Sequence, residues 1–213
     1  MSERIPFYPN TGDGTHCYQA ALKMALAPFD PKNWTYEELN KICDKQPGKW
    51  TWPTASFLWL LEQGYEVRLV EEFDYRAFAK KGYEYLLKKS GKEVADAQKK
   101  NSSLSREQKW AKRLVEHAGF ALDDRIPTWE DLKSYRSRGY SIICNVNSCK
   151  LYKQPGYSGH FVVPVSVEET SIILHDPGLP AKPSQTVLRA VFEEAWGYPT
   201  DHEKNLVAIR KEG

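Results

Sequence analysis

The stretch NTGDGTHCYQAALKMAL, residues 10–26, sets where the first helix of the chain begins, and it contains Cys17. Residues 10–16 are polar and contain two glycines, which predicts a turn or loop. From Cys17 onward apolar residues recur at helical spacing, and prolines at positions 28 and 31 end the run. The sequence therefore predicts a helix with the Cys17 thiol in its first turn.

A thiol in that position is expected to be reactive, because the N–H groups and dipole of a helix N-terminus favour the thiolate. His160 opens a predicted strand, and Asp176 follows the next one. If these strands pair as a hairpin that turns near residues 168–170, both side chains lie at one sheet edge. Each residue alone has an ordinary interpretation: a buried thiol, a sheet histidine, a turn residue before proline. Together they predict a thiolate–imidazole pair with an orienting carboxylate.

Composition limits the classes of partner. The chain has 213 residues, 41% of them apolar, which is enough for a core in one domain or one domain with an insertion. Thirty Lys and Arg residues against 28 Asp and Glu leave a net charge of only +2, so neither nucleic acid nor an anionic membrane is an expected partner. The N-terminal residues contain no apolar targeting segment, and no window approaches ~18 apolar residues. We therefore expect a soluble, cytoplasmic protein.

The cysteines argue against a disulfide framework and against zinc. There are four, at positions 17, 43, 144 and 149, and they are scattered. No second pair of Cys or His stands at metal-ligand spacing, so neither a metal nor a cofactor is expected.

The remaining patterns predict an α+β protein in which helices come first and an antiparallel sheet follows. Residues 1–213 are expected to form a single domain with a helical insertion at about 72–125, whose helices are joined by a breaker-rich segment. Helices are predicted over residues 35–42, 54–62, 75–89, 107–117, 128–138 and 186–196, and strands over 66–70, 140–147, 161–167, 171–175 and 206–210.

This order of segments resembles the papain-like cysteine peptidases of the bacteriocin-leader-processing type, in particular their stand-alone relatives called peptidase C39-like proteins. The resemblance covers most of the chain outside about 72–125. It implies a papain-like fold, with an N-terminal nucleophile helix packed on a C-terminal antiparallel sheet. The segments that carry it are IPFY at 5–8, CYQAA at 17–21, GYSII at 139–143, GHFVV at 159–163 and HDPG at 175–178.

The resemblance also implies a catalytic triad: Cys17 as nucleophile, His160 as general base and acid, and Asp176 as the residue that orients His160. In this family a glutamine before the nucleophile helps to form the oxyanion hole with the backbone N–H of the cysteine. Here Asn10 stands in its place, one methylene shorter and with one extra residue before Cys17. The family usually has Gly-Pro or Trp after the nucleophile, where this chain has Tyr18 and Gln19.

The expected function is that of a cysteine peptidase or amidase, a hydrolase that cleaves a peptide or amide bond through a Cys17 thioester. Two alternatives stay open: an acyl or peptidyl transferase that uses the same triad on a small-molecule amide, and a non-catalytic binding protein that kept the fold. A closed pocket under the insertion would favour a small substrate, and an open groove a peptide.

Neighbouring polar and aromatic residues receive structural interpretations. Gln19 is predicted on the helix surface, and His16 is predicted to make hydrogen bonds in the loop. Trp50 and Trp52 are predicted in the core, with groove lining as the alternative.

Overall fold

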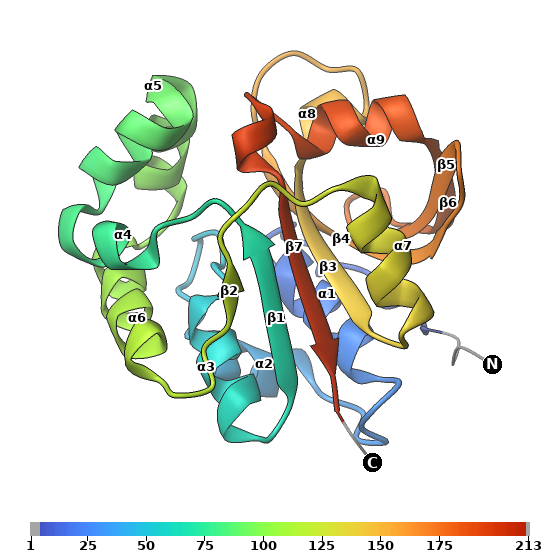
Figure 1. Ribbon diagram of the computed structural model, residues 1–213, viewed down its shortest axis with the longest axis horizontal. Helices are drawn as coiled ribbons and strands as arrows, with labels where there is room; N and C mark the ends of the chain where they lie inside the picture. The colour runs from blue at the N-terminus through green and yellow to red at the C-terminus, as the bar shows by residue number, and fades with distance from the viewer. Residues whose placement is uncertain (1–4, 212–213) are drawn as a thin grey trace.

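The computed structural model describes residues 5–211, which form a seven-stranded sheet with helices on both faces (Figure 1). The prediction that the N-terminal residues contain no targeting segment includes positions 1–4, which lie outside the described residues. The strands follow the order β2-β1-β7-β3-β4-β5-β6 across the sheet. They are β1 (Glu66–Glu71), β2 (Leu122–Asp123), β3 (Ser141–Asn147), β4 (Gly159–Val167), β5 (Ser171–Asp176), β6 (Lys182–Leu188) and β7 (Asn205–Arg210).

The predicted α+β class is confirmed. The prediction of an antiparallel sheet is wrong for one pair of strands. β1 and β2 pair in parallel, whereas the other neighbouring strands are antiparallel. β2 runs parallel to β1 because the whole helical insertion separates them and carries the chain back to the same end of the sheet. The sheet is therefore mixed.

The helices cover the sheet in two layers. They are α1 (Cys17–Leu26), α2 (Tyr36–Ile42), α3 (Thr54–Glu62), α4 (Tyr75–Lys81), α5 (Tyr83–Asn101), α6 (Leu104–Glu116), α7 (Trp129–Ser137), α8 (Ser148–Leu151) and α9 (Arg189–Trp196), with a 3-10 turn, η1 (Asp201–Glu203). In Figure 1, α1, α2 and α3 lie behind β1 and β7, and α7 and α9 lie in front. No helix within residues 5–211 is both long and apolar enough to cross a membrane.

The strands at the centre of the sheet alternate between two buried faces. In β7, Val207 and Ile209 belong to the core under α1 and α3, whereas Leu206 and Ala208 belong to the core under α7 and α9. A strand buried on both faces is almost continuously apolar, as this one is. Burial of Leu206, Val207 or Ile209 contributes about 1.5–3 kcal/mol each to the free energy of unfolding. The two cores therefore hold in place the sheet that carries the site.

α1 begins at Cys17, as the sequence predicts. Its apolar face packs on the sheet, where the ring of Tyr18 lies edge-on to Phe161 at 4.7 Å between centroids. The first turn contains no acidic residue, so no side-chain carboxylate competes with the thiol for the N–H groups at this end. Packing against β4 thus places Cys17 beside the start of that strand.

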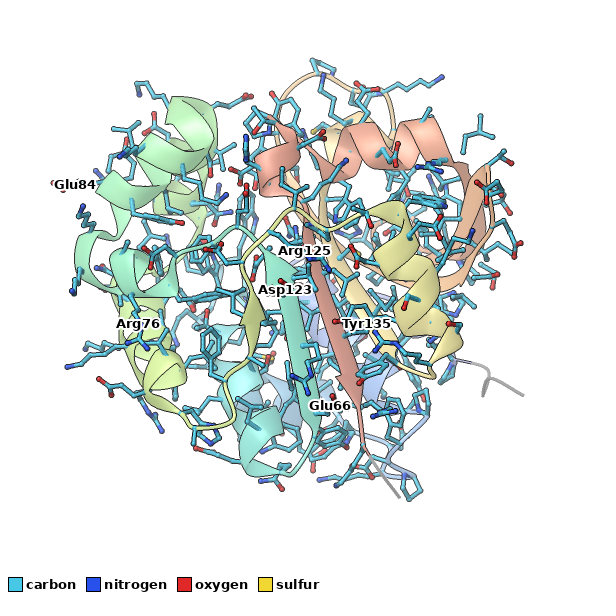
Figure 2. The ribbon with its side chains drawn as sticks, in the orientation of Figure 1. Glu66, Arg76, Glu84, Asp123, Arg125 and Tyr135 are labelled. Carbon is cyan, nitrogen blue, oxygen red and sulfur yellow. The ribbon has the colours of Figure 1, made fainter. Side chains whose placement is uncertain are left out.

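Capping boxes start α2 and α7, as predicted from the sequence. Thr35 with Glu38, and Thr128 with Asp131, exchange the reciprocal side-chain to backbone hydrogen bonds. Arg125 adds ion pairs to Asp131 at 2.7 Å and to Asp123 at 2.8 Å, and Figure 2 shows Asp123 and Arg125 together in front of the sheet. β2 is thereby tied to the start of α7.

The helix predicted over residues 186–196 is wrong in its first turn. β6 continues to Leu188, and α9 begins at Arg189. Val187 pairs with Ile172 of β5 and is buried, whereas Leu188 is 65% exposed. Pairing with a neighbouring strand therefore decides the conformation of residues that local spacing assigned to a helix.

The breaker-rich joint predicted over residues 90–105 is also wrong. α5 extends to Asn101, interrupted only at Gly91, whose φ of 78° breaks the helical path. Val94 and Ala95, which follow this break, are buried and give the second half of α5 an apolar surface to pack. Residues 72–125 therefore form three helices, of which α6 packs against α3.

Candidate active site

Cys17 is half-buried at the N-terminus of α1 and forms a hydrogen bond with the His160 side chain. Burial opposes ionisation of the thiol. The hydrogen bond and charge of His160, with the backbone N–H groups of Phe161 and Tyr18, outweigh that penalty and lower the pKa of Cys17. The arrangement favours a thiolate.

His160 and Asp176 come from adjacent antiparallel strands, β4 and β5, and meet at one end of them. Nε2 of His160 donates to Oδ1 of Asp176 at 2.5 Å. Burial lowers the pKa of His160, but the hydrogen bonds to Asp176 and Cys17 reverse this and raise it above the usual range. Because Nε2 is bound to Asp176, Nδ1 is the nitrogen left for Cys17. The structure thus brings together three of the four residues predicted for the site.

Two further residues, which sequence reasoning missed, hold Asp176. The Tyr152 hydroxyl donates to Oδ2, and the Gly178 N–H donates to Oδ1 at 2.7 Å. A Cβ at position 178 would lie 2.9 Å from Oδ1 of Asp176 and 3.3 Å from the His160 ring. The HDPG segment contained a signal for Gly178, since a glycine beside an acidic turn residue permits close approach. Tyr152 had none, because only the fold brings the end of α8 to Asp176.

Asn10 lies beside both the nucleophile helix and the acid turn. Its backbone N–H donates to the carbonyl of Pro177 at 2.8 Å, and its Oδ1 accepts from the N–H groups of His16 at 2.8 Å and Thr11 at 2.9 Å. Asn10 is buried and is not among the residues that line the cleft. Its observed bonds shape the loop before Cys17, and its role as an oxyanion donor stays a prediction.

The prediction that Gln19 lies on the helix surface is wrong, because Gln19 is fully buried. Its Nε2 donates to Asn40 and to Thr51, at 3.0 Å each. Asn40 in turn contacts Nε2 of His16, and Nδ1 of His16 lies 2.6 Å from the Thr11 hydroxyl, so the hydrogen bonding predicted for His16 is confirmed. This chain of polar contacts braces the loop that leads into Cys17.

A cleft of about 230 Å³ opens beside Cys17 and His160. α5 lines one side of it and the segment from α9 to the start of β7 the other, and these elements flank the upper end of the sheet in Figure 1. Trp50 and Trp52 line the cleft, so the groove-lining alternative holds for both. Further residues that line it are Glu71, Glu72, Phe73, Tyr75, Lys89, Asn145, Tyr157, Tyr198, His202, Glu203, Lys204 and Asn205.

The remaining cysteines do not join this site. Within residues 5–211 all four cysteines are free thiols, and no group of three or more His, Cys, Asp or Glu is placed to hold a metal ion. Burial raises the pKa of both Cys43 and Cys144 above that of an ordinary thiol. Among Cys17, Cys43 and Cys144, Cys17 is the thiol whose surroundings promote ionisation.

No protein-family model and no curated protein matched the chain.

Proposed function

We propose that this chain is a papain-like cysteine hydrolase, a peptidase or amidase related to the stand-alone C39-like type, which cleaves an amide through a thioester on Cys17. One observation carries the proposal: Cys17 at the start of α1 is hydrogen-bonded to His160, whose Nε2 donates to Asp176 at 2.5 Å, in a cleft. A nucleophile, a base and a group that orients the base are the elements of covalent acyl transfer.

The reaction follows from these positions. Sγ of Cys17 attacks the carbonyl carbon, and the oxygen becomes an oxyanion near the N-terminus of α1, where the backbone N–H groups favour negative charge. The C–N bond then breaks, and His160 gives its proton to the leaving amine. Water, deprotonated by His160, attacks the thioester and releases the acid and the Cys17 thiol. Asp176 keeps Nδ1 of the imidazole directed at Cys17 throughout.

The nucleophile is tested by the pH dependence of iodoacetamide labelling. Cys149 is also half-buried, so the measurement uses the Cys149→Ser background, in which Cys17 is the accessible thiol. We expect labelling to continue well below pH 7, and His160→Gln to move the apparent pKa to about 8.5 or above. Mass spectrometry of the alkylated peptide locates the label.

The control is Cys17→Ser in the same background, which should take up no label at neutral pH. If Cys17 in the unmodified site reacts with an apparent pKa near the free value of ~8.5, the thiolate–imidazolium pair is absent, and a binding protein becomes the better description.

One feature favours the acyl transferase as a second candidate. α5 forms a wall of the cleft, which suits a compact substrate better than an extended peptide. Single-turnover acylation by p-nitrophenyl acetate, followed by addition of a primary amine at increasing concentration, separates the two candidates. In a transferase the rate of acyl transfer to the amine saturates, whereas in a hydrolase it rises only linearly with the amine.

A further inference from the structure

A row of residues that line the cleft crosses four strands, from Phe161 beside Cys17 to Glu71. Phe161, whose backbone N–H bonds to Cys17, stands opposite Asn145, and Glu71 stands opposite Asn205. The Asn205 side chain joins the two pairs, accepting from the Asn145 N–H at 2.7 Å and donating to the Asn145 carbonyl at 3.0 Å. Three strand spacings separate Phe161 from Glu71, a span of about 14 Å.

Glu71 stands out among the acidic residues that line the cleft. Glu72 lies 2.5 Å from His202, and Glu203 lies 3.4 Å from Lys89. Glu71 accepts a hydrogen bond from the Tyr75 hydroxyl at 2.7 Å, and within the described chain no cationic side chain lies within salt-bridge distance of it.

The two lysines that line the cleft with Glu71 are engaged elsewhere. Lys89 contributes positive potential at Glu71, but its Nζ bonds to the carbonyl of His202 at 2.7 Å. Lys204 pairs with Asp201 at 3.0 Å. Burial raises the pKa of Glu71 to about 7, and a cation placed beside it would favour the ionised form.

The path between Cys17 and Glu71 suits a chain with an apolar or amide body. Trp52, Phe73 and Tyr157 line the cleft that contains both residues. Asn145 also lines it, and its side-chain amide makes no hydrogen bond to any of residues 5–211. Aromatic rings pack favourably against alkyl chains and cations. The side-chain amide of Asn145 can exchange hydrogen bonds with an amide group of the substrate.

We propose that Glu71 forms a specificity subsite for a cationic amine. The substrate then carries a primary ammonium group separated from the carbonyl attacked by Cys17 by a distance comparable to the span of about 14 Å between Phe161 and Glu71. The proposal rests on the hydrolase function above and adds the substrate class. The carboxylate binds the ammonium group, the aromatic residues hold the connecting chain, and Asn145 binds an amide within it.

The test compares chloroacetamides that alkylate Cys17 and differ only in their tails. Polymethylene tails of graded length end in an ammonium, a hydroxyl or a carboxylate group, and labelling rates are measured in the Cys149→Ser background. We expect the ammonium compound whose tail spans about 14 Å to label about tenfold faster than its hydroxyl counterpart. The carboxylate compound should be the slowest, and Glu71→Gln should remove the differences.

The matched control is Glu84→Gln, which changes the same charge on the outer edge of α5, where Figure 2 shows this side chain pointing away from the rest of the molecule. It should leave the ammonium preference intact. Gln at position 71 still accepts from Tyr75, and circular dichroism verifies that the variant is folded.

Equal rates for all three tails, or a preference that survives in Glu71→Gln, would overturn the subsite. Failure of the hydrolase proposal gives a different result, because iodoacetamide would then show an ordinary Cys17 pKa in every variant. In that case titration calorimetry with the unreactive acetamide analogues still decides the subsite: tighter binding of the ammonium analogue, lost in Glu71→Gln, supports it, and equal binding rejects it.

Discussion

Gly178 contributes to the candidate site through its missing side chain and its N–H group. The N–H binds Oδ1 of Asp176, the same oxygen that accepts from His160. A carboxylate fixed by two donors on one oxygen and by Tyr152 on the other has little rotational freedom. The orientation of His160 therefore depends on a residue that carries no reactive group.

Gly178→Ala tests this dependence. The added methyl group would stand 2.9 Å from Oδ1, closer than a Cβ tolerates, so Asp176 or the residue 177–179 turn must move. We expect Cys17 alkylation at pH 6 to slow by roughly tenfold, because His160 no longer holds the thiolate as well. Gly12→Ala is the control, since a Cβ there meets no atom within 4 Å. Unchanged alkylation in Gly178→Ala would contradict the positioning role.

Asn10→Asp separates the two roles of Asn10. Aspartate keeps the oxygen that accepts from His16 and Thr11 but loses the amide N–H that would bind an oxyanion. We expect acylation by p-nitrophenyl acetate to fall by on the order of a hundredfold, whereas alkylation by iodoacetamide, which forms no oxyanion, changes little. A parallel loss in both reactions would show that Asn10 acts through the loop alone.

At the scale of elements, α6 carries an acidic group into the core. Glu107 is 7% exposed, and its Oε2 has no hydrogen-bond partner within the described residues. Burial raises the pKa of Glu107 to about 8 from an ordinary value of 4.5. α6 therefore docks beside α3 with a protonated carboxyl at neutral pH and below.

The pH dependence of stability follows from that shift. The pKa of Glu107 is higher in the folded state than in the unfolded state. Its stabilising contribution to the free energy of unfolding is therefore fully present below pH 4.5, declines as pH rises toward 8, and is lost above pH 8. The loss is on the order of 5 kcal/mol in the free energy of unfolding. Glu107→Gln should lack this decline in urea unfolding between pH 5 and 9. Glu116→Gln, exposed on the same helix, should keep it, and identical profiles for wild type and Glu107→Gln would refute the prediction.

The elements that the sequence predicts correctly have local signals. The start of α1 follows from a polar loop, an apolar period and two prolines, and α2 and α7 follow from their capping boxes. β6 and the second half of α5 depend on neighbours distant in sequence. The same division holds at the site: the positions of Cys17, His160 and Asp176 could be read from strand and helix ends. The burial of Gln19 and the contact of Tyr152 with Asp176 arise only in the folded chain.

At the scale of the molecule, the cleft is formed where polar contacts join α5 of the helical insertion to the segment between α9 and β7. Lys89 of α5 binds Glu203 and the carbonyl of His202, and Ser90 donates to Glu203 at 2.9 Å. Tyr198 adds a hydrogen bond to Glu93 at 2.7 Å. These polar contacts join two walls that belong to distant parts of the chain (Figure 1).

Lys89→Met should weaken the contact between α5 and the segment before β7 without unfolding the protein. It removes the ion pair to Glu203 and the bond to His202, and we expect amide hydrogen exchange in α5 to accelerate by roughly threefold to tenfold. Lys88→Met, exposed on the same helix, should have no effect. Unchanged exchange in Lys89→Met would mean that apolar packing alone holds α5 in place.

The position of β7 has a consequence for the order in which the protein can be completed. β7 lies in the middle of the sheet, between β1 and β3, although it is the last strand made on the ribosome. Until residues 205–210 have left the exit tunnel, β1 has no link through the sheet to β3, and Glu71 has no fixed place relative to Cys17. A nascent chain could therefore pair Cys17 with His160 and Asp176 before Glu71 is placed, and the last strand completes the proposed substrate site.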